Sequence, residues 1–144
     1  MRIYLSSLVV MIGVFKLHMW GMDGAYTRIW WLDIASHTLV SFAIALCIGG
    51  LITSLSPSIH HKKLLIVALT FIIGFAWEGL EVYYNITGHP LWSYEYYFDT
   101  IKDLIDDTIG ASIAAYITTR KGMKYKGGIN ESPLAVETIK INNQ

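Results

Sequence analysis

The chain has 144 residues, of which 53% are hydrophobic and only 15% are charged. This length fits one domain, but a mean hydropathy of +0.44 excludes an ordinary soluble one. A formal net charge of zero argues against nucleic acid as a partner, and the single cysteine, Cys47, excludes an internal disulfide and a cysteine-based zinc cluster.

Four apolar stretches, taken in chain order, are each long enough for a helix that crosses a bilayer, which needs about 20 residues. They run from about Tyr4 to Trp20, from Trp30 to Leu55, from Leu64 to Asn85 and from Asp99 to Thr119. The sequence therefore predicts an all-α fold, an integral membrane bundle of four transmembrane helices in a domain that spans residues 1–119. The polar segment 120–144 is predicted to be a flexible tail.

The loop charges predict the orientation of this bundle, because Lys and Arg gather on the cytoplasmic side of membrane proteins. Arg28 falls in a loop on one side. The basic residues on the other side are more numerous: Arg2, Lys62, Lys63, Arg120, Lys121, Lys124 and Lys126. We therefore expect both termini, and the tail, in the cytoplasm, and the chain in the cell membrane as a multi-pass protein.

Ionisable side chains concentrate in the outer halves of three predicted helices. They are Asp33 and His37 in the second helix, Glu78 and Glu81 in the third, and Asp99, Asp103, Asp106 and Asp107 in the fourth. Residues three or four apart share a helix face, and the four aspartates of the last helix fall within an arc of about 80°. At about 1.5 Å per residue, the deeper members of all three helices reach a similar depth, roughly 10 to 12 Å below the surface. Ionisable groups inside a membrane span are costly and mark function by default.

So many carboxylates in a region of low dielectric cannot all stay ionised without compensation. Protonation, water or bound cations would each relieve the repulsion. A mixed carboxylate and imidazole set is a conventional site for a divalent metal ion. The predicted ligands are Asp33, His37, Glu78, Asp103 and Asp107. Glu81 and Asp99 lie closer to the water and are expected outside this ligand set.

Simpler interpretations of single residues stand beside the metal site. Asp99 fits the N-cap or first turn of the fourth helix, where the helix dipole favours an acid. Asp106 and Lys102 are four apart and fit an ion pair. His37, taken alone, fits a hydrogen-bonded structural histidine.

Three motifs carry a family resemblance. They are Asp33-Ile-Ala-Ser-His37, Trp77-Glu78-Gly-Leu-Glu81, and Asp99-Thr-Ile-Lys-Asp103 continuing through Asp107 to Gly110-Ala111. Together, over about residues 30–118, they resemble the YjdF-like family of predicted membrane proteins. Members of that family are longer and have extra helices before this core. The resemblance implies a shared polar site but no particular reaction.

Three functions fit these features. The first is a metal-dependent membrane hydrolase or transferase acting on lipid or lipid-linked substrate, with Glu78 or Glu81 as catalytic general base. The second is a cation or proton-coupled carrier. Since the inner helix halves carry essentially no charge, a carrier would need a homo-oligomer or a conformational change to complete its route. The third is a non-catalytic sensor or partner-binding subunit.

Overall fold

The computed structural model describes residues 2–55, 60–84, 86 and 88–120. Within this part of the chain all regular structure is helical, as the sequence predicts. The long helices are α1 (Arg2–Trp20), α3 (Trp31–Leu55), α4 (Lys62–Tyr84) and α5 (Tyr94–Thr119). The prediction of a flexible tail concerns residues that, apart from Arg120, lie outside the described ones.

Three helical segments are long and apolar enough to cross a membrane: Ile3–Arg28, Trp31–Leu55 and Lys62–Tyr84. Helix α5 is as long as the others, but its aspartates and Lys102 interrupt its apolar character. Three of its acidic side chains, Asp103, Asp106 and Asp107, are buried, while an isoleucine stripe is exposed. That stripe consists of Ile101, Ile105, Ile109 and Ile113.

Two short elements link α1 to α3: a kinked turn, η1 (Gly21–Ala25), and one helical turn, α2 (Tyr26–Arg28). The kink depends on Gly24, whose φ of +94° is a conformation that side chains with a Cβ rarely adopt. The turn brings Tyr26 back against the end of α1.

Helix α5 begins earlier than the sequence pattern predicts, at Tyr94 instead of Asp99. Its N-cap is Ser93, whose side-chain oxygen accepts a hydrogen bond from the Tyr96 backbone N–H at 3.2 Å. The interpretation of Asp99 as the N-cap or first-turn acid is therefore wrong. Asp99 instead lies in the second turn, one turn before Asp103.

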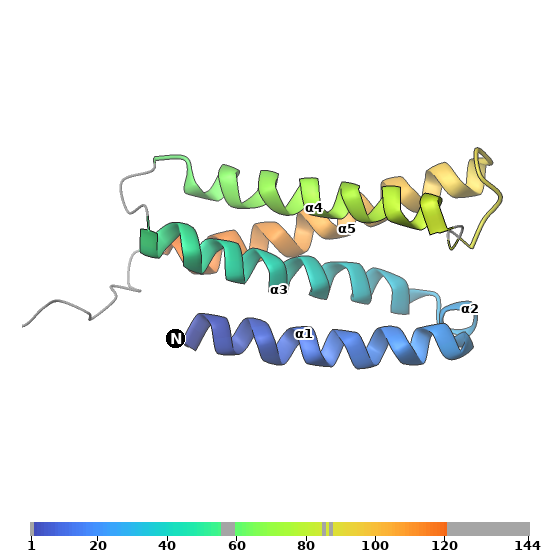
Figure 1. Cartoon of the computed structure of the whole chain (residues 1–144), viewed down its shortest axis with the longest axis horizontal. Coiled ribbons are helices and arrows are strands. Elements are labelled where there is room, and N and C mark those ends of the chain that lie inside the picture. The colour runs from blue at the N-terminus through green and yellow to red at the C-terminus, as the bar shows by residue number, and fades with distance from the viewer. Residues whose placement is uncertain (1, 56–59, 85, 87, 121–144) are drawn as a thin grey trace, which may run out of the picture.

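The four long helices run side by side, with α1 and α4 on the outside and α3 and α5 between them (Figure 1). One end of the bundle, here called the carboxylate end, holds the α1–α3 and α4–α5 connections. The opposite end, here called the termini end, holds the start of α1 and the end of α5.

Small residues close the termini half of the bundle. The core there consists of Ala45, Leu46, Ile66, Ala111, Ala114 and Ala115. A Cβ added at Gly110 would lie 2.1 Å from the Thr38 carbonyl oxygen, and one at Gly49 would lie 2.4 Å from Thr118 Oγ1. Helices α3 and α5 therefore approach each other closely, which is how helices associate when lipid surrounds them.

Candidate metal centre

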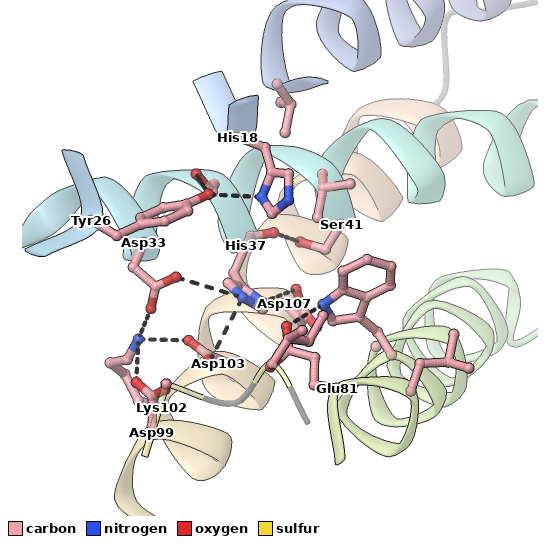
Figure 2. Close-up of a pocket in the computed structure, with 18 of the residues that line it drawn as sticks. His18, Tyr26, Asp33, His37, Ser41, Glu81, Asp99, Lys102, Asp103 and Asp107 are labelled. Carbon is pink, nitrogen blue, oxygen red and sulfur yellow. Dashed lines mark hydrogen bonds and ion pairs between the residues drawn. The ribbon is translucent and has the colours of Figure 1, made fainter. Parts of the chain in front are cut away.

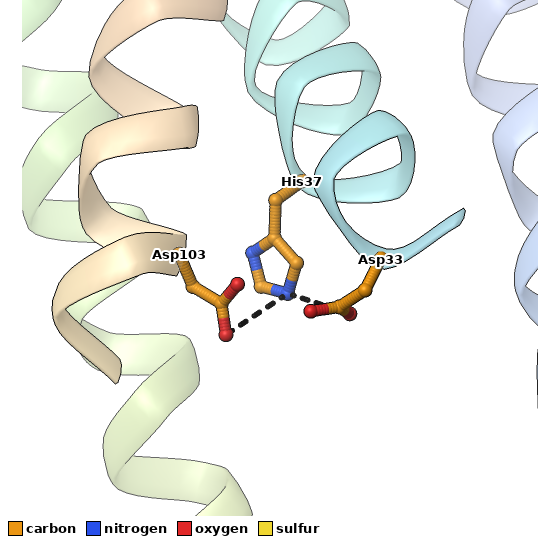
Figure 3. A group of neighbouring side chains, drawn as sticks. All are labelled: Asp33, His37 and Asp103. Atoms are coloured by element: carbon orange, nitrogen blue, oxygen red, sulfur yellow. Dashed lines mark ion pairs between the residues drawn. The ribbon is translucent and has the colours of Figure 1, made fainter. Parts of the chain in front are cut away.

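The polar residues of α3 and α5 meet at the carboxylate end of the bundle. One ligand atom from each of Asp33, His37 and Asp103 can be chosen so that all three lie within 4.8 Å of one another. His37 Nε2 is 3.8 Å from Asp33 Oδ1 and 3.7 Å from Asp103 Oδ2. Figure 3 shows the imidazole between the two carboxylates, with Asp103 approaching from α5.

Lys102 binds the far sides of the same carboxylates. Its Nζ contacts Asp33 Oδ2 and lies 2.6 Å from Asp103 Oδ1 and 3.3 Å from Asp99 Oδ1. The ammonium therefore uses one oxygen of Asp33 and one of Asp103, and their other oxygens face His37. Among the described residues the ion pairs of Lys102 are with these three acids, so the interpretation of Lys102 and Asp106 as an ion pair is wrong.

Asp107 lies on the other side of the His37 ring. Its Oδ1 is 3.6 Å from His37 Nδ1, while Asp33 and Asp103 face Nε2. Gly74 of α4 makes room for this carboxylate, because a Cβ there would lie 2.2 Å from Asp107 Oδ2. The contact is too long for a hydrogen bond, but it puts a carboxylate on the ring nitrogen opposite the cluster, the position from which carboxylates orient metal-binding histidines.

The two glutamates of α4 have different surroundings. Glu81 lines a cavity and accepts a hydrogen bond from Trp77 Nε1 at 2.6 Å. Glu78 is buried beside Thr100 of α5 and is not part of the cavity lining. Its Oε1 has no hydrogen-bond partner among the described residues, and neither have Asp106 Oδ2 and Asp107 Oδ1.

A cavity of about 940 Å³ extends from the three-residue cluster along α3, between α1 and α4. Asp33, His37 and Asp103 all line its polar end, as Figure 2 shows. The remainder of its wall is mainly apolar, and its deepest lining residues are near the middle of their helices: Met11, Ile44 and Thr70. Beyond that level the small-residue core closes the bundle.

The structure therefore brings together three of the five predicted metal ligands, places Asp107 behind His37, and separates Glu78 from the cavity. It also adds residues that the sequence pattern did not indicate. Lys102 bridges acids of two helices, and Tyr26 joins the cavity wall from the short α2 turn. No motif in the sequence around Tyr26 indicates a place in the site.

Long apolar helices around a buried polar cluster define a multi-pass membrane protein. The chain belongs to a family of predicted membrane proteins, DUF2238, whose model matches residues 2–123. This match agrees with the YjdF-like resemblance of the three motifs. No curated protein and no solved structure matches the chain.

Proposed function

We propose that this protein is a metal-dependent membrane enzyme that acts on lipid or lipid-linked substrate. One observation carries the proposal: the clustered oxygens and nitrogen of Asp33, His37 and Asp103 lie at the polar end of a large, mainly apolar cavity. Carboxylate and imidazole ligands suit divalent cations such as Zn²⁺ or Mn²⁺. An apolar cavity with a few convergent polar groups is the usual form of a small-molecule site.

The surrounding residues would prepare this cluster for an ion. Lys102 holds the outer oxygens of Asp33 and Asp103 and leaves their inner oxygens free, and Asp107 orients His37. A divalent ion at such a site supplies Lewis acidity and a more acidic bound water. Glu81 is the better candidate for the general base because it lines the cavity, and Glu78 would support the cluster from behind.

The membrane topology in this proposal has four spans. At about 1.5 Å per residue the 26 residues of α5 reach about 39 Å, which exceeds the thickness of the hydrocarbon core. The exposed isoleucine stripe would face lipid, and the acids would face the bundle interior. Lys62, Lys63 and Arg120 lie at the termini end and Arg28 at the other, which favours cytoplasmic termini.

A non-catalytic role is the second candidate, and Lys102 is the observation that favours it. Its ammonium compensates the charge of Asp33, Asp99 and Asp103 without any ion. A carrier is less well supported, because the cavity lining stops near the middle of the helices and an apolar core of alanine, leucine and isoleucine side chains fills the level beyond it.

Elemental analysis of purified protein separates these candidates. We expect about one divalent ion per chain in the wild type, and its loss in His37→Ala and Asp103→Asn. Asp106→Asn is the matched control, since Asp106 lies outside the three-residue cluster, and it should retain the ion. A wild type that stays metal-free after reloading with Zn²⁺ or Mn²⁺ would contradict the proposal.

Turnover provides the second half of the test. Glu81→Gln should keep the ion and lose about 10²- to 10⁴-fold in the rate of lipid hydrolysis, the usual contribution of a general base. A metal-loaded protein that hydrolyses no lipid ester or phosphoester would favour the non-catalytic role.

A further inference from the structure

A second polar group lies on the cavity wall, apart from the three-residue cluster. His18 of α1 and Tyr26 of α2 both line the cavity. His18 Nδ1 lies 2.9 Å from the Tyr26 hydroxyl, which lies 3.2 Å from Ser36 Oγ on α3. Figure 2 shows this pair on the opposite side of His37 from Asp103.

The direction of this hydrogen-bonded chain follows from its last member. Ser36 Oγ lies 2.9 Å from the Leu32 carbonyl oxygen, which can only accept, so the Ser36 hydroxyl donates its hydrogen there. Ser36 Oγ is then free to accept from Tyr26. The Tyr26 oxygen in turn accepts from His18 Nδ1–H. The chain therefore fixes neutral His18 in the Nδ1–H tautomer and leaves Nε2 as a hydrogen-bond acceptor.

The other polar groups of the wall make the cavity rich in acceptors. Most donors there already bond to the protein itself: Tyr26, Ser36, Ser41, Thr70, Trp77 and Lys102. Carboxyl oxygens, in contrast, accept hydrogen bonds, and Asp33, Asp99, Asp103, Asp107 and Glu81 all line the cavity. A ligand that brings hydrogen-bond donors thus complements this wall better than an anionic one.

We infer that the cavity binds lipids with an uncharged, hydroxyl-bearing head group, and that His18 Nε2 accepts a hydrogen bond from one of those hydroxyls. The acyl chain lies along the apolar wall formed by Val14, Phe15, Val40 and Ile73. This inference rests on the proposed function, because it assumes that the cavity takes lipid. It narrows the substrate to an ester or glycoside with free hydroxyls.

Tryptophan quenching by brominated lipids tests the inference, since Trp30 and Trp77 line the cavity. The protein is studied in phosphatidylcholine nanodiscs after chelator treatment. The probes share a dibromostearyl or dibromostearoyl chain and differ in the head: a monoacylglycerol, a methyl ester, a lysophosphatidate and a primary amine. We expect the monoacylglycerol to bind about 10-fold more tightly than the methyl ester, as two net hydrogen bonds allow. Tightest binding of the lysophosphatidate or the amine would overturn the inference.

The His18→Phe variant removes the Nε2 acceptor, together with the Nδ1 contact to Tyr26, and keeps an aromatic side chain. It should lose about 5-fold of the monoacylglycerol preference, while His61→Phe, the same change in an exposed histidine at the termini end, should lose none. An unchanged preference in His18→Phe would contradict the assignment of His18.

Two features keep this test independent of other failures. The ¹⁵N NMR spectrum of histidine-labelled wild type reports the His18 tautomer even if His18→Phe does not fold, and an Nε2–H form would overturn the inference. Since binding is measured without metal, a missing ion would sink the proposed enzyme and leave the head-group preference to be judged on its own.

Discussion

The interface between α3 and α5 has two halves of different character, one polar and beside a cavity and the other apolar and closely packed. In the carboxylate half, Asp33 and His37 face Asp103 and Asp107 beside an open cavity. In the termini half, the same faces carry Ala45 and Gly49 on α3, and Ala114 and Thr118 on α5, and they are closed. The change occurs at Ser41 and Gly110.

The two halves therefore contribute differently to the stability of the bundle. A charge in a membrane span costs about 2.5 to 3.5 kcal/mol on insertion scales, so the carboxylate half contributes little net stability of its own. The termini half offsets this cost with close backbone packing. A closed half that holds α3 and α5 together allows the other half to keep charges and a cavity.

The largest expected effect comes from breaking the closed half at Gly110. A Cβ at Gly110 would lie 2.1 Å from the Thr38 carbonyl oxygen and 2.3 Å from Ser41 Oγ. Because the first of these atoms is backbone, α3 and α5 must move apart. We expect Gly110→Leu to destabilise the bundle by at least about 3 kcal/mol, at the upper end of overpacking costs, measured by unfolding in mixed micelles.

Gly79→Leu is the matched control for this variant. Gly79 is also helical, but a Cβ there meets nothing within 4 Å. Its effect on the free energy of unfolding should stay within about 0.5 kcal/mol. Equal destabilisation by the two variants would show that the closed half is not what holds the bundle together.

The sequence predicted which helix faces are polar, but not which side chains pair with one another in the carboxylate half. Helical spacing places Asp33 with His37 and Asp103 with Asp107, because it depends only on residues within one helix. Lys102 pairs with Asp33 of α3 across the helix interface. The i, i+4 spacing, which considers one helix alone, had assigned it to Asp106 instead. The start of α5 was misplaced because the Ser93 cap is followed by aromatic and acidic residues and not by an apolar run.

The two glutamates of α4 also show that spacing within one helix does not determine what a side chain contacts. Glu78 and Glu81 share a helix face by spacing, yet the first is buried against α5 and the second lines the cavity. Which of them faces the substrate depends on how α4 is rotated against its neighbours. That rotation is a property of the packed bundle.

An intermediate effect is expected when the compensating cation is removed from the carboxylate half. Lys102→Met leaves the acids Asp33, Asp99 and Asp103 without their shared ammonium. We expect a loss of about 2 kcal/mol in metal-free protein, less than for a fully buried pair because Lys102 is partly exposed. A saturating divalent ion should restore part of this loss by mass action, since it supplies the missing positive charge.

Thermal unfolding with and without metal measures this effect. Lys16→Met, in an exposed lysine of α1, is the control and should be neutral under both conditions. If metal protects wild type and Lys102→Met equally, Lys102 and the ion do not share the same acids, and the proposed site loses its main support.

The smallest effect is expected from Gly74→Ala, which changes the packing of the carboxylate half alone. A Cβ at Gly74 would lie 2.2 Å from Asp107 Oδ2, which belongs to the end of a side chain that can rotate away. The bundle should therefore persist in Gly74→Ala, unlike in Gly110→Leu. The displaced carboxylate would leave His37 Nδ1, now 3.6 Å from Asp107 Oδ1. Loss of such an orienting partner weakens metal binding by about 10-fold, which isothermal titration would measure.

Gly13→Ala is the matched control, because a Cβ there meets nothing within 4 Å, and it should bind metal as tightly as the wild type. Unchanged affinity in Gly74→Ala would mean that Asp107 does not orient the histidine, and that the carboxylate half tolerates packing changes as freely as the lipid-facing surface.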